Sequence, residues 1–191
     1  PKKIIEGREA DIRPCLRCSD CMSSMIAFRG MRCAVNPVIG REGDFFHPVP
    51  VNRHRKVLIA GGGPAGMEAA LTAAEKGHEV VLCEERSVLG GALKFADNGA
   101  HNKLTMRRYR DSQIRKVTEN PAIEIRLNTR VDETVVNEVK PDVLIAAVGA
   151  LPVTPPIPGA DSKNVIFGAD LMADTPLGQN VVVIGGGMIG C

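Results

Sequence analysis

A glycine-rich turn between an apolar run and an alanine-rich stretch places the strongest constraint on how this chain folds. The run Val57–Ala60 precedes Gly61-x-Gly63-x-x-Gly66, and the residues after the turn have the composition of a helix. A second apolar run, Val80–Cys83, follows that stretch. Strand, turn, helix and strand in this order predict a βαβ unit, and in that context the pattern is typical of a dinucleotide-binding fold.

Each residue type in this turn has a physical role in binding a dinucleotide. Gly61 allows the tight turn, Gly63 lets the backbone approach a pyrophosphate, and Gly66 lets helix and strand pack closely. The start of the helix supplies N–H donors and a positive dipole to the phosphates. Glu84 follows about 20 residues later, where a carboxylate accepts hydrogen bonds from an adenosine ribose. The alternative is a glycine-rich structural turn without a ligand, which is less favoured because every part of the pattern is present.

A cluster of cysteines lies near the start of the sequence. Cys15, Cys18 and Cys21 have the spacing C-x2-C-x2-C, and Cys33 follows after a longer interval. A compact triplet with a distant fourth thiol suits a [4Fe-4S] cluster, whereas zinc sites usually bring their ligands in separated pairs. Zinc and unrelated thiols remain the alternatives. Cys83 lies in an apolar run, where it is expected to be a small buried hydrophobe.

The segments after the βαβ unit continue the same kind of fold. Residues 102–120 predict a helix, residues 122–131 a strand, and the apolar run 141–150 a buried parallel strand. The glycine-bearing loop before the helix, with Gly91, allows a second backbone approach to the dinucleotide. We therefore predict an α/β, Rossmann-like FAD/NAD(P)-binding domain preceded by a cysteine-rich iron–sulfur segment.

A proline-rich stretch marks a predicted boundary after this domain. Its prolines are Pro152, Pro155, Pro156 and Pro158, which favour an extended linker. The predicted division is a cysteine-rich [4Fe-4S] segment at 1–50, an FAD- or ADP-binding domain at 51–155, and a linker with the start of an NAD(P)H-binding domain at 156–191.

The last residues begin the glycine pattern a second time. An apolar run, Val181–Ile184, predicts a strand and is followed by Gly185-x-Gly187-x-x-Gly190, and the sequence ends one residue later. A phosphate-binding turn needs the helix that it opens and a following strand with a ribose-binding acid. We therefore expect a truncated chain whose intact protein has two cofactor sites, one for a flavin and one for NAD(P)H.

Composition and charge exclude several other classes of function. The formal net charge is +2 and aromatic residues make up 3% of the chain, so neither a general attraction to nucleic acid nor a base-stacking surface is expected. No apolar run approaches the ~20 residues needed to cross a bilayer. The start, "PKKIIEGREADIRP", is charged and lacks the apolar centre of a signal peptide. The sequence predicts a cytoplasmic protein with a small-molecule substrate.

Five motifs in succession resemble one known family. They are "RPCLRCSDC…CAVNP", "VLIAGGGPAGMEAA", "ERSVLGGALKFA", "DVLIAAVGALP" and "VVVIGGGMIG". In this order they resemble the region after the flavin-bearing barrel in the iron–sulfur flavoenzymes typified by trimethylamine dehydrogenase, dienoyl-CoA reductase and 2-enoate reductase. The resemblance implies an N-terminal TIM barrel with FMN as partner, a [4Fe-4S] cluster, an FAD domain and an inserted NAD(P)H domain.

The resemblance also implies roles for individual residues. The four clustered cysteines are similar to the cluster ligands of the family, and the second glycine pattern to its NAD(P)H site. The residues similar to the family's adenosine, pyrophosphate and further FAD contacts are Gly61, Gly63, Pro64, Ala65, Glu84, Gly91, Val131, Ala147, Val148 and Gly149. The cysteine spacing is like that of trimethylamine dehydrogenase, where ADP takes the place of FAD.

Together these cofactors predict an electron-transfer function. NAD(P)H gives up two electrons as a hydride and an iron–sulfur cluster passes one at a time, so a flavin is needed between them. The predicted function is the electron-transfer part of an NAD(P)H-dependent flavin oxidoreductase, with enoate or enoyl reduction on the barrel. The alternatives are an amine dehydrogenase-type fragment with ADP in place of FAD, and a non-redox structural module that binds ADP and zinc.

Overall fold

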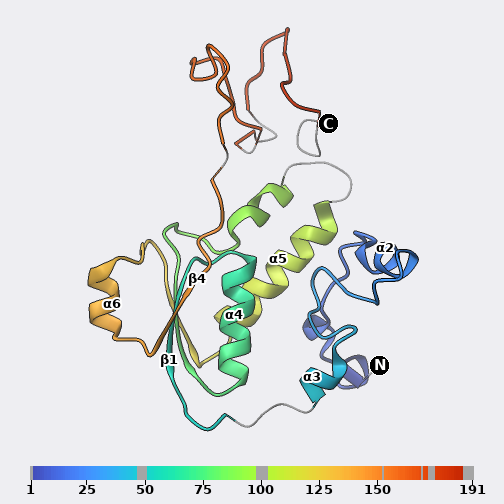
Figure 1. Ribbon diagram of the computed structural model, residues 1–191, viewed down its shortest axis with the longest axis vertical. Helices are drawn as coiled ribbons and strands as arrows, with labels where there is room; N and C mark the ends of the chain where they lie inside the picture. Colours follow the sequence, from blue (N-terminus) through green and yellow to red (C-terminus); the bar gives the residue numbers. More distant parts are fainter. Residues whose placement is uncertain are drawn as a thin grey trace.

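The centre of the molecule is a parallel β-sheet. The computed structural model describes residues 2–46, 51–97, 103–151, 153–168, 170–171 and 175–186. Within them the sheet has the strand order β3-β2-β1-β4, with every neighbouring pair parallel (Figure 1). The strands are β1 (Lys56–Ala60), β2 (Glu79–Cys83), β3 (Ile123–Arg126) and β4 (Val143–Ala146). The predicted α/β class with a parallel sheet is confirmed.

Helices cover both faces of this sheet. Helices α4 (Pro64–Glu75) and α5 (Lys103–Thr118) lie on one face, and α6 (Glu133–Val139) lies on the other (Figure 1). Alternate residues of each strand point to opposite faces, so the sheet supplies two apolar cores. The core beneath α4 and α5 includes Ile59, Met67, Leu82 and Val117. The core beneath α6 consists of Leu58, Val81, Cys83 and Val139.

The cysteine-bearing N-terminal segment packs against α4 and α5 on the side away from the sheet (Figure 1). Its short elements are α1 (Lys2–Ile5), the 3-10 helix η1 (Glu9–Asp11), α2 (Asp20–Ile26) and α3 (Glu42–Phe46).

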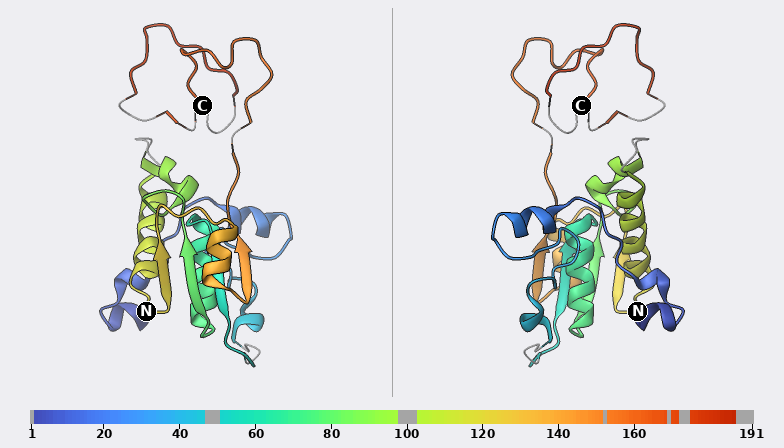
Figure 2. Two further views of the ribbon diagram at one scale, coloured as in Figure 1. Left: turned by 90° about the vertical axis from the view of Figure 1, so that its left-hand side faces the viewer. Right: turned by 90° about the vertical axis from the view of Figure 1, so that its right-hand side faces the viewer.

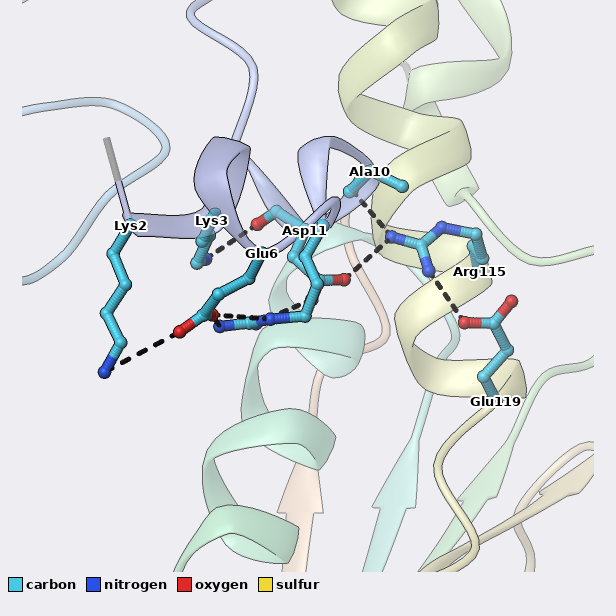
Figure 3. Close-up of polar contacts among 8 residues, drawn as sticks. Lys2, Lys3, Glu6, Ala10, Asp11, Arg115 and Glu119 are labelled. Carbon is cyan, nitrogen blue, oxygen red and sulfur yellow. Dashed lines mark hydrogen bonds and ion pairs between the residues drawn. The ribbon is translucent and has the colours of Figure 1, made fainter.

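Arg115 of α5 holds the first part of that segment through a polar network (Figure 3). Its guanidinium donates to the carbonyl of Ala10 at 2.6 Å and pairs with Asp11 at 3.3 Å and Glu119 at 2.7 Å. Lys3 Nζ donates to the carbonyl of Asp11 at 2.8 Å. Helix α5 therefore holds residues 10 and 11 of the segment through Arg115.

The strand β4 is less buried than its sequence predicts. The apolar run 141–150 indicates a fully buried strand, yet the Leu144 side chain is 50% exposed. β4 lies at the edge of the sheet, and the core beneath α6 is centred on β1 and β2. The short helix α6 was not predicted; Asp132 Oδ1 caps it by accepting from the Val135 N–H at 3.0 Å.

The described residues beyond 150 extend past the carboxyl end of the sheet (Figure 2). The strand predicted at Val181–Ile184 is wrong for this structure: these residues form no strand, and their side chains are 55–86% exposed. Within the described part of the chain, no neighbouring strand pairs with the backbone N–H and C=O groups of this run. Among the described helices, none is both long enough and apolar enough to cross a membrane.

Candidate cofactor-binding site

The first glycine turn lies at the carboxyl end of β1. Gly61 has φ +107°, and its N–H donates to the Cys83 carbonyl at 2.8 Å. A side chain at Gly61 would collide with the backbone oxygen of Ala147, and one at Gly66 would collide with the carbonyl oxygen of Gly61. Both positions require glycine, because the Ala147 backbone lies against Gly61 and the Gly61 backbone lies against Gly66.

Helix α4 begins directly after this turn. Gly63 is its N-cap residue, Pro64 is the first residue of the helix, and Ala65 follows in the first turn. The Met67 N–H donates to the Gly63 carbonyl at 2.9 Å. The N–H groups of the first turn have no partner within a helix, and the helix dipole is positive at this end. This arrangement favours an anion such as a phosphate.

A second glycine loop lies opposite the helix start. A Cβ added to Gly91 would come within 2.8 Å of Gly63 Cα, and Gly91 has φ +51°. The neighbouring Gly90 has φ +118°, and its N–H donates to the Gly62 carbonyl at 2.9 Å. The two loops are therefore joined through backbone, and contact of Gly91 with a dinucleotide stays a prediction.

Glu84 is buried next to the turn. Its Oε2 accepts from the Gly62 N–H at 2.7 Å, and its Oε1 accepts from the Arg86 N–H at 3.0 Å. Each carboxylate oxygen has two lone pairs, so both keep acceptor capacity for a ribose hydroxyl. The carboxylate thus also shapes the turn, a role that the sequence analysis did not include. A side chain at Gly62 would meet both Leu89 and Glu84, so the middle glycine of "GGGP" is constrained as well.

The segment after β4 completes this edge of the sheet. The Ala147 N–H donates to the Ala60 carbonyl at 2.8 Å, which places Ala147 beside the first turn. Val148 is 77% exposed, and Gly149 has φ +74° with open space around it. Val131 lies in the loop between β3 and α6 and packs on the core beneath α6. That loop reaches the end of β2, because the Thr129 N–H donates to the Glu84 carbonyl at 2.8 Å.

The second glycine pattern is only partly within the described residues. Gly185 has φ +107°, the same value as Gly61, and an added Cβ there would meet no atom of the described residues within 4 Å. Gly187 and Gly190 lie outside the described residues. The structure therefore describes the turn conformation of the first glycine alone.

The four clustered cysteines lie on one stretch of the N-terminal segment. Cys15 and Cys18 are exposed in the loop before α2, Cys21 is in the first turn of α2, and Cys33 is half-buried beyond that helix. Across the described ranges, no three His, Cys, Asp or Glu side chains are grouped so that they could hold a metal ion. The Arg17 N–H donates to Cys15 Sγ at 3.3 Å, with Arg17 at φ 55°. Cluster binding by these thiols stays a prediction.

Cys83 differs from the other described cysteines. It is fully buried at the end of β2, and burial raises the pKa of its thiol. The predicted role as a small buried hydrophobe agrees with this environment.

The fold and this edge of the sheet define a class: a Rossmann-like domain with a glycine turn at the carboxyl end of a parallel sheet, which is where domains of this class bind nucleotides. The family model of the pyridine nucleotide-disulphide oxidoreductases matches residues 55–191. The chain belongs to this family.

Relatives along the whole chain are oxidoreductases. The chain is 39% identical to an NADH oxidase of Thermoanaerobacter brockii and 36% identical to a cinnamate reductase of Clostridium sporogenes, in each case over 100% of its length. It spans 30% and 28% of those relatives, which are therefore much longer proteins. The resemblance to the iron–sulfur flavoenzyme family is confirmed by these matches and by a dimethylamine dehydrogenase of Hyphomicrobium, 34% identical over 68% of this chain and 19% of that protein.

A solved structure has the same arrangement. The 2-naphthoyl-CoA reductase in complex with 2-naphthoyl-CoA matches with a TM-score of 0.73 and 35% identity. The match covers 87% of this chain and 25% of that one. The comparison supports the fold of the N-terminal segment and the sheet together, because it extends over more of the chain than the family model does.

Proposed function

We propose that this chain is the electron-transfer part of an NAD(P)H-dependent flavin oxidoreductase. In this proposal the glycine turn after β1 binds the adenine dinucleotide FAD, and the four clustered cysteines hold a [4Fe-4S] cluster. The rest of the protein carries FMN on a barrel, with enoate or enoyl reduction as its reaction. The proposed division of the chain is the predicted one, at residues 50 and 155.

One observation carries the dinucleotide site: segments far apart in sequence meet at the carboxyl end of the sheet. Gly61 lies against Ala147, Gly63 against Gly91, and the Glu84 carboxylate against the turn between them. Such a cradle leaves backbone N–H groups for a pyrophosphate and a buried carboxylate for a ribose. These contacts support a binding role over a glycine turn that serves only to reverse the chain.

The chemistry of the donor set supports the cluster. Cys15, Cys18, Cys21 and Cys33 provide four thiols within one short stretch, which matches the all-thiolate ligation of [4Fe-4S] clusters. The backbone N–H that already points at Cys15 Sγ is a type of donor that tunes the potential of such sites. When bound, a cluster supplies one-electron transfer, which complements the two-electron hydride chemistry of NAD(P)H.

A dimethylamine dehydrogenase among the relatives favours ADP as the second candidate for the dinucleotide site. The cysteine spacing resembles that of the amine dehydrogenases, and the cradle recognises the ADP half that both ligands share. The choice between FAD and ADP changes the redox role of the site but leaves its binding residues the same.

The test combines metal analysis with calorimetry on anaerobically purified protein. We expect four iron and four acid-labile sulfide per chain, as the cluster formula requires, together with saturable binding of FAD or ADP. Bound zinc without acid-labile sulfide would overturn the cluster and favour the non-redox structural module that binds ADP and zinc. Absence of FAD and ADP binding in a folded chain would overturn the dinucleotide site.

A further inference from the structure

One arginine of the N-terminal segment is bound to the helix that opens at the glycine turn. Arg13 donates from Nη1 and Nη2 to Glu68 Oε2 and Oε1 of α4, each at 3.0 Å. Both side chains are largely shielded, at 27% and 28% exposure. A bidentate arginine–carboxylate pair fixes the orientation of the two side chains as well as their distance, whereas a single hydrogen bond fixes only the distance.

The same guanidinium also holds the far side of the cysteine stretch. Arg13 Nη1 donates to the carbonyl oxygen of Val35, a residue that is itself buried. Arg13 lies two residues before Cys15, and Val35 lies two residues after Cys33. One side chain therefore joins both flanks of the stretch that contains all four clustered cysteines.

Helix α5 completes the polar cluster around Glu68. Gln113 Nε2 donates to Glu68 Oε2 at 2.7 Å and contacts the Tyr109 hydroxyl at 3.2 Å. Gln113 is 1% exposed and Tyr109 is 7% exposed. The Oε1 atom of Gln113 is buried with no hydrogen-bond partner among the described residues, so only its Nε2 contributes to this cluster. Buried hydrogen bonds are costly to break, so these Nε2 contacts keep Glu68 in place for Arg13.

We propose that Arg13 is a positioning residue that fixes the cysteine stretch against helix α4. Glu68 lies four residues after Pro64, which corresponds to about 6 Å along the helix axis. The arginine thus sets the position of the thiols relative to the start of α4, where the dinucleotide is proposed to bind. The inference rests on the proposed function for its redox meaning, but the contacts can be tested without any cofactor.

Amide hydrogen exchange measures this positioning directly. In the 191-residue chain we expect Arg13→Gln to speed exchange of residues 15–35 at least tenfold, with exchange in β1 and β2 unchanged. Glu68→Gln should have the same effect. The double variant should add little to either single change, because both changes break the same Arg13–Glu68 contact. Arg41→Gln is the matched control, since Arg41 pairs with Asp44 on an exposed surface of the same segment.

The tyrosine supplies a second readout. Tyr109 is the only tyrosine and the chain has no tryptophan, so its fluorescence reports this site alone. Acrylamide quenching should increase in Arg13→Gln and stay at the parent value in Arg41→Gln. Arg13→Lys keeps the charge but cannot form the bidentate pair, so its amide exchange and its quenching should lie between those of the parent and Arg13→Gln. It provides a milder variant if Arg13→Gln does not fold.

Two results would overturn the proposal. One is exchange of residues 15–35 in Arg13→Gln equal to that in Arg41→Gln; the other is additive effects of Arg13→Gln and Glu68→Gln in the double variant. Failure of the proposed function would appear instead in the parent protein, as missing iron or missing nucleotide binding. The two failures are therefore distinguishable.

Discussion

Replacement of Glu84 by glutamine tests whether one buried carboxylate both shapes the glycine turn and recognises a ribose. The carboxylate accepts the Gly62 N–H at 2.7 Å and the Arg86 N–H at 3.0 Å. A glutamine amide has one oxygen, so its NH₂ group must face one of these two donors. Loss of a charge-assisted hydrogen bond at a buried site costs about 1.5–3 kcal/mol.

This cost predicts two measurable changes. The Tm should fall by about 3–12 °C, because 1 kcal/mol corresponds to roughly 2–4 °C for a domain of this size. Affinity for ADP or FAD should fall roughly tenfold or more, since a tenfold change corresponds to about 1.4 kcal/mol. Thermal unfolding gives the first value, and calorimetric titration well below the Tm of the variant gives the second.

The neighbouring Glu85 provides a matched control. Glu85 is exposed, so Glu85→Gln removes the same charge one residue away from the turn. We expect that control to stay within about 0.5 kcal/mol of the parent protein in stability. Equal behaviour of the two variants in both assays would refute the reasoning. A loss of stability with unchanged ADP affinity would leave Glu84 a structural role and remove it from the ribose site.

Three further predictions concern the turn, the thiols and the α5 interface. Gly66→Ala should cost about 1–3 kcal/mol and abolish ADP binding in calorimetry, because the new methyl collides with the turn. Gly178→Ala should have neither effect, because the added methyl would meet no atom of the described residues within 4 Å. Cys18→Ser should remove bound iron, since a hydroxyl is a poor ligand for iron; full iron and sulfide content would contradict the cluster assignment. Burial, with a smaller contribution from Glu68, raises the pKa of Tyr109. Tyrosinate absorbance should therefore appear at higher pH in the native protein than in urea-unfolded protein. It should appear at lower pH in Glu68→Gln than in the parent. Because the folded state holds this proton more tightly, the associated stability is present below about pH 10 and is lost as the pH rises through the folded pKa.

Local features of the sequence were sufficient for the fold class and for the glycine turn between β1 and α4. An apolar run, a glycine turn and an alanine-rich stretch specify their own backbone geometry, because glycine at φ +107° and a helix start depend on neighbouring residues. Gly61 and Gly185 share the same φ of +107°, although the latter precedes residues outside the described part.

Contacts between distant residues were decided by the tertiary structure. Nothing in the sequence indicates that Arg13 meets Glu68, 55 positions away, or that Glu84 accepts the Gly62 N–H. Likewise, Val143–Ala146 and Val181–Ile184 are similar apolar runs, yet the former pairs with β1 and the latter does not form a strand. The pattern of apolar residues indicates which residues favour burial. The neighbours that bury them depend on strand order and helix packing. A strand needs an adjacent strand for its hydrogen bonds, and the chain supplies one to Val143–Ala146 alone of these two runs within its described residues.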